Sequence, residues 1–394
     1  MLVLTAALVA EPAVAQQENA SPPRAFVPGV ASVDPQAQNG WIDFDSRANG
    51  LILIPITLNG QRLMALVDTG APTIMVDAHW ATQHGLKYQP YQNVGSLGGD
   101  AAQISIAPVA TLDIAGVRQT GGAITVGDLN PVSSTAGTSI DAIVGADFLS
   151  AHAVTLDFDN HRVRFQPSGS PRPSGTVVPI EPREYGRRFV TKLTVGKRRL
   201  SPVIIDTGNN GSLAIATDAM SSSDMTVRTT NIAWVGLSGE LILSDIGRLD
   251  GVQFGGERFD KVQVTFEPQP FDPGDEARIG IKLLDRFNVF LDMGQRVMVL
   301  SPRTVDPKPE AVTMSGIQGD WSNAGLQIVH VMRGSPAEAL GLRPGDRICA
   351  IDGIKIVADP QSRLRKWSLG PAGKTVSLTM CDGRVIPLTL REFY

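Results

Sequence analysis

The sequence LVDTG at residues 66–70 closes one apolar stretch of the chain, and IIDTG at residues 204–208 closes another. In each copy, Asp-Thr-Gly follows hydrophobic residues of the kind that favour a β-strand. A single triplet of this composition is typical of an ordinary turn, because aspartate and glycine are common turn residues. In this chain the triplet occurs twice, with its two aspartates 138 positions apart.

Three further landmarks recur downstream of the triplets, in the same order and at nearly the same spacing. They are residues 112–116 with 252–255, residues 143–149 with 278–284, and residues 156–157 with 291–292. Such an ordered series is hard to obtain by chance. It indicates an internal duplication, in which two copies of one fold follow each other along the chain.

The composition favours strands over helices. The 394 residues suffice for two or three domains, and they include 40 glycines and 27 prolines but only 19% charged residues, as expected for short strands joined by turns. Residues 51–58 (LILIPITL) lead into Asn59-Gly60, a hairpin signal. We therefore expect a mostly β protein with two homologous β-barrel-like lobes, related by a pseudo-twofold axis, and a small α+β domain at the C-terminus.

Segments rich in Pro, Ser, Gly or Gln divide the chain. The predicted linkers are residues 16–40, 166–176 and 301–310, and they separate a first lobe at 41–165, a second lobe at 177–300 and a C-terminal domain at 311–394.

The first residues favour export. Residues 1–10 are apolar and Ala13-Val14-Ala15 follows as an A-x-A cleavage pattern, so residues 1–15 are predicted to be a signal peptide, although no basic residue precedes the apolar run. The protein is then expected in the periplasm or outside the cell. No other run reaches 18 apolar residues, so no membrane span is expected. Cys349 and Cys381 could pair in an oxidising compartment, but two small, mostly buried thiols are the favoured interpretation.

A pseudo-twofold axis between the lobes can bring the two Asp-Thr-Gly loops together at one cleft, so that their carboxylates face each other. Neighbouring carboxylates share one proton, so that one acts as a general base on water while the other polarises a carbonyl group. With this pairing, the two copies resemble an aspartic protease fused into one chain. The resemblance implies catalytic roles for Asp68 and Asp206. The resemblance also implies that the other residues of the triplets support the aspartate pair, namely Thr69, Gly70, Thr207 and Gly208.

The same family places an apolar-apolar-Gly strand behind each triplet. Ile143-Val144-Gly145 fits this pattern well, whereas Arg278-Ile279-Gly280 carries an arginine in place of an apolar residue. Ala71 and Asn209 follow the triplets where pepsin-like enzymes usually have Ser or Thr. The absence of cysteines from both lobes resembles fused retroviral-type subunits more closely than pepsin.

Glycine-rich segments follow each triplet at a distance suited to flaps over a substrate cleft. Such flaps would offer backbone groups to an extended peptide, although ordinary hairpin loops are the alternative. The predicted flap residues are Gly95, Leu97, Gly98, Gly99, Gly236 and Gly239.

Other chemistries find little support. A net charge of −4 gives no electrostatic footprint for nucleic acid. The five histidines form no H-E-x-x-H motif, and G-x-S-x-G is absent. We therefore expect no metal, no cofactor and no nucleic acid partner, and a monomeric protein.

The C-terminal domain resembles a PDZ domain through residues 334–337 (GSPA), 341–342 (GL), 345–348 (GDRI) and 351–353 (IDG). PDZ domains add an extended peptide to a sheet edge. Gly325 and Leu326 are the predicted peptide-binding residues, while a PDZ fold that only packs on the protease is the alternative.

The sequence as a whole thus predicts an exported aspartic endopeptidase that acts on peptide or protein substrates and carries a PDZ module for a peptide ligand. The alternative is a non-catalytic peptide-binding protein with a degenerate protease cleft.

Overall fold

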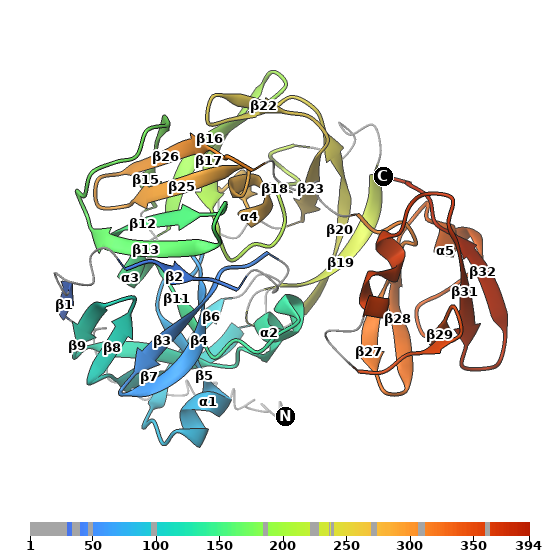
Figure 1. Ribbon diagram of the computed structural model, residues 1–394, viewed down its shortest axis with the longest axis horizontal. Coiled ribbons are helices and arrows are strands. Elements are labelled where there is room, and N and C mark those ends of the chain that lie inside the picture. The colour runs from blue at the N-terminus through green and yellow to red at the C-terminus, as the bar shows by residue number, and fades with distance from the viewer. Residues whose placement is uncertain are drawn as a thin grey trace, which may run out of the picture.

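The protein folds into three β-rich bodies, two of which share a sheet (Figure 1). The computed structural model describes residues 30–33, 40–45, 50–95, 101–183, 188–220, 228–235, 237, 240–268, 274–305, 312–358 and 363–394. Within these ranges no helix is both long enough and apolar enough to cross a bilayer. The expected mostly β fold with a small C-terminal domain is confirmed.

The first lobe is a curled ten-stranded sheet in which β4 and β11 lie at the centre. Its strand order is β1 (Val30–Val33), β9 (Val117–Thr120), β8 (Thr111–Ile114), β3 (Leu53–Leu58), β4 (Gln61–Val67), β11 (Ala142–Val144), β5 (Met75–Asp77), β10 (Ala123–Gly127), β7 (Ala101–Pro108) and β6 (Gln89–Gly95). Its helices are α1 (Ala78–Gln83), α2 (Asn130–Ala136) and α3 (Ala146–Leu149). Asp77 caps α1 by accepting the Trp80 N–H at 2.9 Å.

The second lobe repeats this plan, with β17 and β24 at the centre of its sheet. Its strand order is β19 (Arg228–Val235), β20 (Glu240–Leu249), β23 (Val262–Glu267), β18 (Leu213–Ala216), β24 (Ala277–Ile279), β17 (Arg198–Ile205), β16 (Phe189–Val195), β21 (Val252–Phe254) and β22 (Glu257–Phe259). In addition, β15 (Glu181–Pro182) pairs with β16, and α4 (Ile281–Leu284) follows β24.

A six-stranded sheet built from both halves of the chain joins the lobes. Its strand order is β14 (Thr176–Pro179), β26 (Val297–Pro302), β25 (Phe287–Asp292), β12 (His152–Asp157), β13 (Arg162–Pro167) and β2 (Ile42–Asp43). The junction is the antiparallel pair of β12 and β25, where Thr155 lies opposite Phe290. One apolar core runs from Ile54 and Val67 in the first lobe to Ile205 and Ile279 in the second. The lobes are therefore fixed to each other by hydrogen bonds and by burial.

The predicted linkers are partly structured. Residues 30–33 of the expected 16–40 linker form β1, which pairs with β9. The 166–176 segment shares its ends with β13 and β14, and β26 extends to Pro302. Pairing with distant strands thus orders parts of segments whose local composition favours a loop. Residues 1–15, the predicted signal peptide, lie outside the described residues.

The C-terminal domain has a core of its own, which includes Leu326, Ile348 and Trp367. Its sheet has the order β27 (Ile317–Ser322), β28 (Gly325–Val331), β29 (Arg347–Ile351), β31 (Thr375–Met380) and β32 (Val385–Thr389), and β30 (Ile354–Lys355) pairs with β29. The helices are α5 (Pro336–Ala339) and the 3-10 helix η3 (Arg363–Leu369). Ser335 caps α5, since its Oγ accepts the Glu338 N–H at 3.2 Å.

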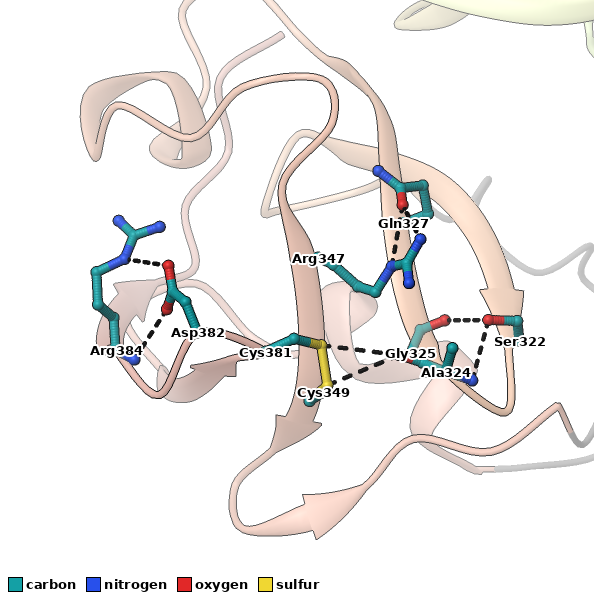
Figure 2. The surroundings of a disulfide bond; sticks show 9 residues. All are labelled: Ser322, Ala324, Gly325, Gln327, Arg347, Cys349, Cys381, Asp382 and Arg384. Atoms are coloured by element: carbon teal, nitrogen blue, oxygen red, sulfur yellow. Dashed lines mark hydrogen bonds and ion pairs between the residues drawn. A yellow bond between two sulfur atoms is a disulfide. The ribbon is translucent and has the colours of Figure 1, made fainter.

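The two cysteines form a disulfide, so the interpretation as two buried thiols was wrong (Figure 2). Antiparallel β29 and β31 place Ile348 opposite Met380, and the cysteines that follow these residues lie with their Cα atoms 5.0 Å apart. Cys381 is exposed and Cys349 is half-buried. The sequence could not show this pairing, because it depends on the register of the two strands.

The C-terminal domain packs against the β19–β20 hairpin of the second lobe (Figure 1). Met332 and Tyr394 bury Ile246 in a small apolar cluster. Polar contacts surround it: Thr229 Oγ1 donates to Arg333 O (2.6 Å), Gln318 Nε2 donates to Asn231 Oδ1 (2.8 Å), and Arg333 pairs with Asp245 (2.9 Å).

Candidate active site

The two Asp-Thr-Gly triplets meet at the interface of the lobes. Asp68 follows the last residue of β4, and Asp206 follows the last residue of β17. A side chain added at Gly70 would collide with the carboxyl group of Asp206, and one added at Gly208 would collide with that of Asp68. Each glycine therefore lies directly against the aspartate of the other lobe. The structure brings Asp68 and Asp206 together, as the sequence predicted.

The two threonines bind across the interface. Thr69 Oγ1 donates to Ile205 O and Thr207 Oγ1 donates to Val67 O, both at 2.7 Å. Each hydroxyl also accepts the backbone N–H of the opposite threonine at 3.0 Å. Both side chains are buried. Because buried hydrogen bonds are costly to break, these four hold the loops that carry the aspartates in a fixed relative position.

A parallel strand lies behind each triplet, with matching register in the two lobes. In the first lobe Ile143 on β11 lies opposite Leu66, and in the second Arg278 on β24 lies opposite Ile204. A glycine follows each strand, Gly145 or Gly280, where a Cβ atom would clash with the backbone of the loop beyond the triplet. The predicted strands behind the triplets are therefore present in both lobes.

The environments of the two aspartates differ. Asp68 Oδ1 accepts the N–H groups of Gly70 (2.7 Å) and Ala71 (3.2 Å). Burial and the neighbouring charge of Asp206 nevertheless raise the pKa of Asp68 to about 7. One carboxyl group of the pair is thus protonated at mildly acidic pH, which is the state that shared-proton chemistry requires.

Asp206 has a charged neighbour that Asp68 lacks among the contacts described. Its Oδ1 accepts the N–H groups of Gly208 (3.0 Å) and Asn209 (3.1 Å), while its Oδ2 accepts from Arg278 Nη1 at 3.4 Å. Arg278 Nη2 donates to Glu267 Oε2 at 2.5 Å. Burial alone would lower the pKa of Arg278, but Glu267 and Asp206 outweigh burial and raise it above its ordinary value.

Arg278 was not predicted as a site residue, and the sequence showed it only as a departure from the strand motif. A signal was available, because a charged residue in an apolar strand behind an Asp-Thr-Gly loop needs a buried partner. A second arginine, Arg188, is also buried near the triplets, and its Nε donates to Gly70 O at 2.7 Å. No sequence signal pointed to Arg188.

The two residues after the triplets contact the aspartates through their backbones. Ala71 and Asn209 donate backbone N–H groups to Asp68 and Asp206, respectively. The side-chain oxygen of Asn209 accepts the Gly211 N–H at 2.8 Å, so this side chain braces its own loop.

The predicted flaps coincide with the ends of two hairpins, β6–β7 and β19–β20. Gly95 is the last residue of β6. The remaining predicted flap residues, Leu97, Gly98, Gly99, Gly236 and Gly239, lie outside the described residues. Leu237 is described, and it packs against an apolar cluster of the first lobe that includes Leu66 and Ile143. The second lobe therefore contacts the first lobe at Leu237.

Family models match two parts of the chain. The model described as aspartyl protease matches residues 54–148, and the model described as PDZ domain matches residues 327–381. The chain contains an aspartyl protease domain and a PDZ domain. The protease match runs from β3 to α3 and includes Asp68, whereas Asp206 lies beyond it. No curated protein matches the chain significantly.

The structure does not support the predicted peptide-binding residues of the PDZ domain. Gly325 and Leu326 begin β28, which lies between β27 and β29. Leu326 is opposite Trp321 on one side and Ile348 on the other. An added peptide needs a strand with a free edge. A peptide therefore cannot add to the sheet alongside Gly325 and Leu326, and any other role of these two residues in peptide binding stays a prediction.

Proposed function

We propose that this protein is an aspartic endopeptidase in which Asp68 and Asp206 share one proton and activate water. The observation that carries the proposal is the crossed arrangement of the triplets, in which each glycine lies against the opposite aspartate. The aspartyl protease match and the threonine hydrogen bonds also support it. Both aspartates come from one chain, so a monomer suffices to complete the site.

In this reaction the pair begins with one proton. The ionised carboxylate takes a proton from water as the water oxygen bonds to the peptide carbonyl carbon, and the protonated carboxyl gives its proton to the carbonyl oxygen. The gem-diol then collapses. The C–N bond breaks, the amine nitrogen takes a proton from the pair, and a gem-diol hydroxyl returns one. The products are a carboxylic acid and an amine, and the pair again holds one proton.

The PDZ domain would bind a peptide segment at β27. Among the described residues β27 pairs with β28 on one side, and we propose that a peptide strand adds along its other edge. The Met314 N–H donates to Ser368 O at 2.7 Å, so η3 flanks the start of this edge. Such a site would hold a substrate or a regulatory peptide beside the second lobe.

Export fits the chemistry of the PDZ domain. Disulfides persist in oxidising compartments, and the partly exposed Cys349–Cys381 bond would be reduced in most cytosols. The predicted signal peptide at residues 1–15, with its apolar run at 1–10, agrees with export. We therefore propose that the protein acts in the periplasm or outside the cell.

The proposal is tested by incubating an unfolded, carboxymethylated protein with the purified chain from pH 4 to pH 8 and identifying new termini by mass spectrometry. Internal cleavage that disappears in Asp206→Asn supports an endopeptidase. The exposed Asp218 offers a matched control, and Asp218→Asn should cleave normally. Binding of the unfolded protein without cleavage at any pH would favour the alternative, a non-catalytic peptide-binding protein.

A further inference from the structure

One position breaks the symmetry of the two lobes at the aspartates. Ile143 and Arg278 occupy the same place in the register, each on the strand behind its triplet. Ile143 is buried among apolar residues. Arg278 has a side chain only 9% exposed, and it lies between Asp206 and Glu267. A buried guanidinium is costly unless it is paired, so its partners are part of its role.

We propose that Arg278 is a positioning residue of the aspartate pair: it holds Asp206 as the ionised carboxylate, so that the shared proton resides on Asp68. The inference rests on the proposed protease function for its consequence in catalysis, but the proton's location is a property of the folded chain itself.

The hydrogen bonds around the pair favour this assignment. Every contact described for Asp206 other than that with Asp68 comes from a donor, namely two backbone N–H groups and the guanidinium. Donors stabilise the charged form of a carboxyl group. Asp68 receives two backbone N–H groups but no arginine in the contacts described, and its pKa of about 7 agrees with a carboxyl group that keeps its proton.

The other charged groups near the pair reinforce or moderate this effect. Glu267, at the end of β23, also forms an ion pair with Arg278. Its negative charge weakens the electrostatic stabilisation that Arg278 gives to the ionised Asp206. Arg188 donates to the backbone oxygen of Gly70, on the loop of the first lobe that carries Asp68. Asp68 itself faces Asp206 from the end of β4.

The assignment gives each aspartate one role. Asp206 takes the proton of the attacking water as the new O–C bond forms, and Asp68 gives its proton to the carbonyl oxygen. When the C–N bond breaks, Asp206 passes its proton to the departing nitrogen and Asp68 recovers one from the gem-diol. The cycle then restores the ionised Asp206 and the protonated Asp68.

The test compares three variants with the wild type: Arg278→Gln, Arg278→Lys and Glu267→Gln. Loss of the guanidinium charge in Arg278→Gln should move the acidic limb of the kcat/KM profile upward by roughly one to three pH units. Arg278→Lys keeps the positive charge, so its acidic limb should lie close to that of the wild type. Glu267→Gln releases the guanidinium from its second partner and should move the limb downward. A merely structural arginine would change kcat or stability in Arg278→Gln without moving the limb.

A second readout does not require activity. The first proton release of the pair, followed by carboxyl ¹³C NMR of aspartate-labelled protein, should occur at higher pH in Arg278→Gln than in wild type. If that shift is present while no variant cleaves any substrate, the inference stands and the protease function fails. If the protein cleaves peptides but neither limb nor titration moves, the inference is overturned and the function stands. Should Arg278→Gln not fold, an unchanged or upward limb in Glu267→Gln overturns the inference by itself.

Discussion

At the scale of the residue, the pKa of Asp68 sets the upper pH limit of the proposed chemistry. Burial and the charge of Asp206 raise that pKa to about 7. Below pH 7 the carboxyl group keeps its proton and the pair can hold the one proton it needs. Above pH 7 that proton is lost, and the pair holds two repelling charges. The expected activity therefore extends from acidic to near-neutral pH and falls on the alkaline side.

A substitution at Ala71 should move the upper pH limit of activity. Ala71 offers Asp68 only its backbone N–H, at 3.2 Å from Oδ1. A serine hydroxyl at this position would add a hydrogen bond to the charged form of Asp68 and lower its pKa. We expect Ala71→Ser to shift the alkaline limb of the kcat/KM profile downward by about half to one pH unit. Ala71→Cys, which is similar in size but a weak donor, is the control. An alkaline limb that stays in place or moves upward in Ala71→Ser would contradict this explanation.

The meeting of Asp68 and Asp206 could be predicted from the sequence, because each Asp-Thr-Gly triplet is a run of neighbouring residues. Aspartate, threonine and glycine stand side by side in each triplet, and the predicted duplication implied that the two triplets meet. The contact of Arg278 with Asp206 could not be predicted in this way. The residues are 72 positions apart, and the register that joins them belongs to two parallel strands, β17 and β24.

At the scale of the element, the hydrogen bonds made by Thr69 and Thr207 hold the two Asp-Thr-Gly loops together. Thr207→Val would leave the buried Val67 O and Thr69 N–H without the Thr207 hydroxyl. We expect this variant to lose roughly 2–5 kcal/mol of unfolding free energy, since each unpaired buried group costs about 1–3 kcal/mol. Thr207→Ser keeps the hydroxyl and should lose only about 1 kcal/mol, for the buried methyl group. Urea unfolding measures both, and equal losses in the two variants would show that the hydroxyl is not responsible.

A second hydrogen-bonded element anchors the chain that leaves the second lobe. Asp159, in the turn between β12 and β13, accepts from Arg303 Nε (3.0 Å), the Thr304 N–H (2.9 Å) and Asn288 Nδ2 (2.8 Å). Burial opposes the charge of Asp159, but the hydrogen bonds from Thr304, Asn288 and Arg303 outweigh it and lower the pKa of Asp159 below its usual range.

A depressed pKa contributes stability that is present above the unfolded value, about 3.9, and is lost as the pH falls toward the folded value. Asp159→Asn should therefore lower the Tm at pH 7 and have a smaller effect below pH 4. Asp113 is a suitable control, because its partner Arg118 is 62% exposed and solvent screens the ion pair, so that Asp113→Asn should change the Tm little at either pH. A loss of Tm in Asp159→Asn that is independent of pH would argue against a charged Asp159.

The strands at the centre of each lobe were readable from their apolar runs, whereas segments at the edges were not. Residues 30–33 resemble a linker in composition and become a strand only because β9 offers a partner. The disulfide and the central position of β28 escaped prediction for the same reason, since both depend on which strands become neighbours.

At the scale of the whole molecule, the shared sheet and the docked PDZ domain make one body of three parts. The PDZ domain covers Ile246 and stands beside β19, the edge strand of the second lobe. A chain that ends after Val305 keeps Arg303 and Thr304 on Asp159, and its main core remains complete. We expect this truncated chain to fold and to cleave short peptides, but with a lower Tm and a greater tendency to aggregate through its uncovered strand edge.

The control for the truncation is Arg333→Gln in the full chain. This variant removes an ion pair with Asp245 in which Arg333 is half exposed, and it should cost less than about 1 kcal/mol. Calorimetry and light scattering compare the three proteins. If the truncated chain cannot fold, the PDZ domain is an integral part of the protease core.

The most direct measurement is the turnover of one internally quenched peptide by wild type, Asp68→Asn and Asp206→Asn at pH 5.5, a value chosen about 1.5 units below the pKa of Asp68. Each asparagine keeps the shape of the side chain but removes one of the two carboxyl groups that share the proton. We predict that wild type cleaves the peptide, and that both variants remain folded by circular dichroism while their kcat falls by roughly a thousandfold or more. Near-normal turnover in either folded variant would contradict the assignment of Asp68 and Asp206 as the catalytic pair.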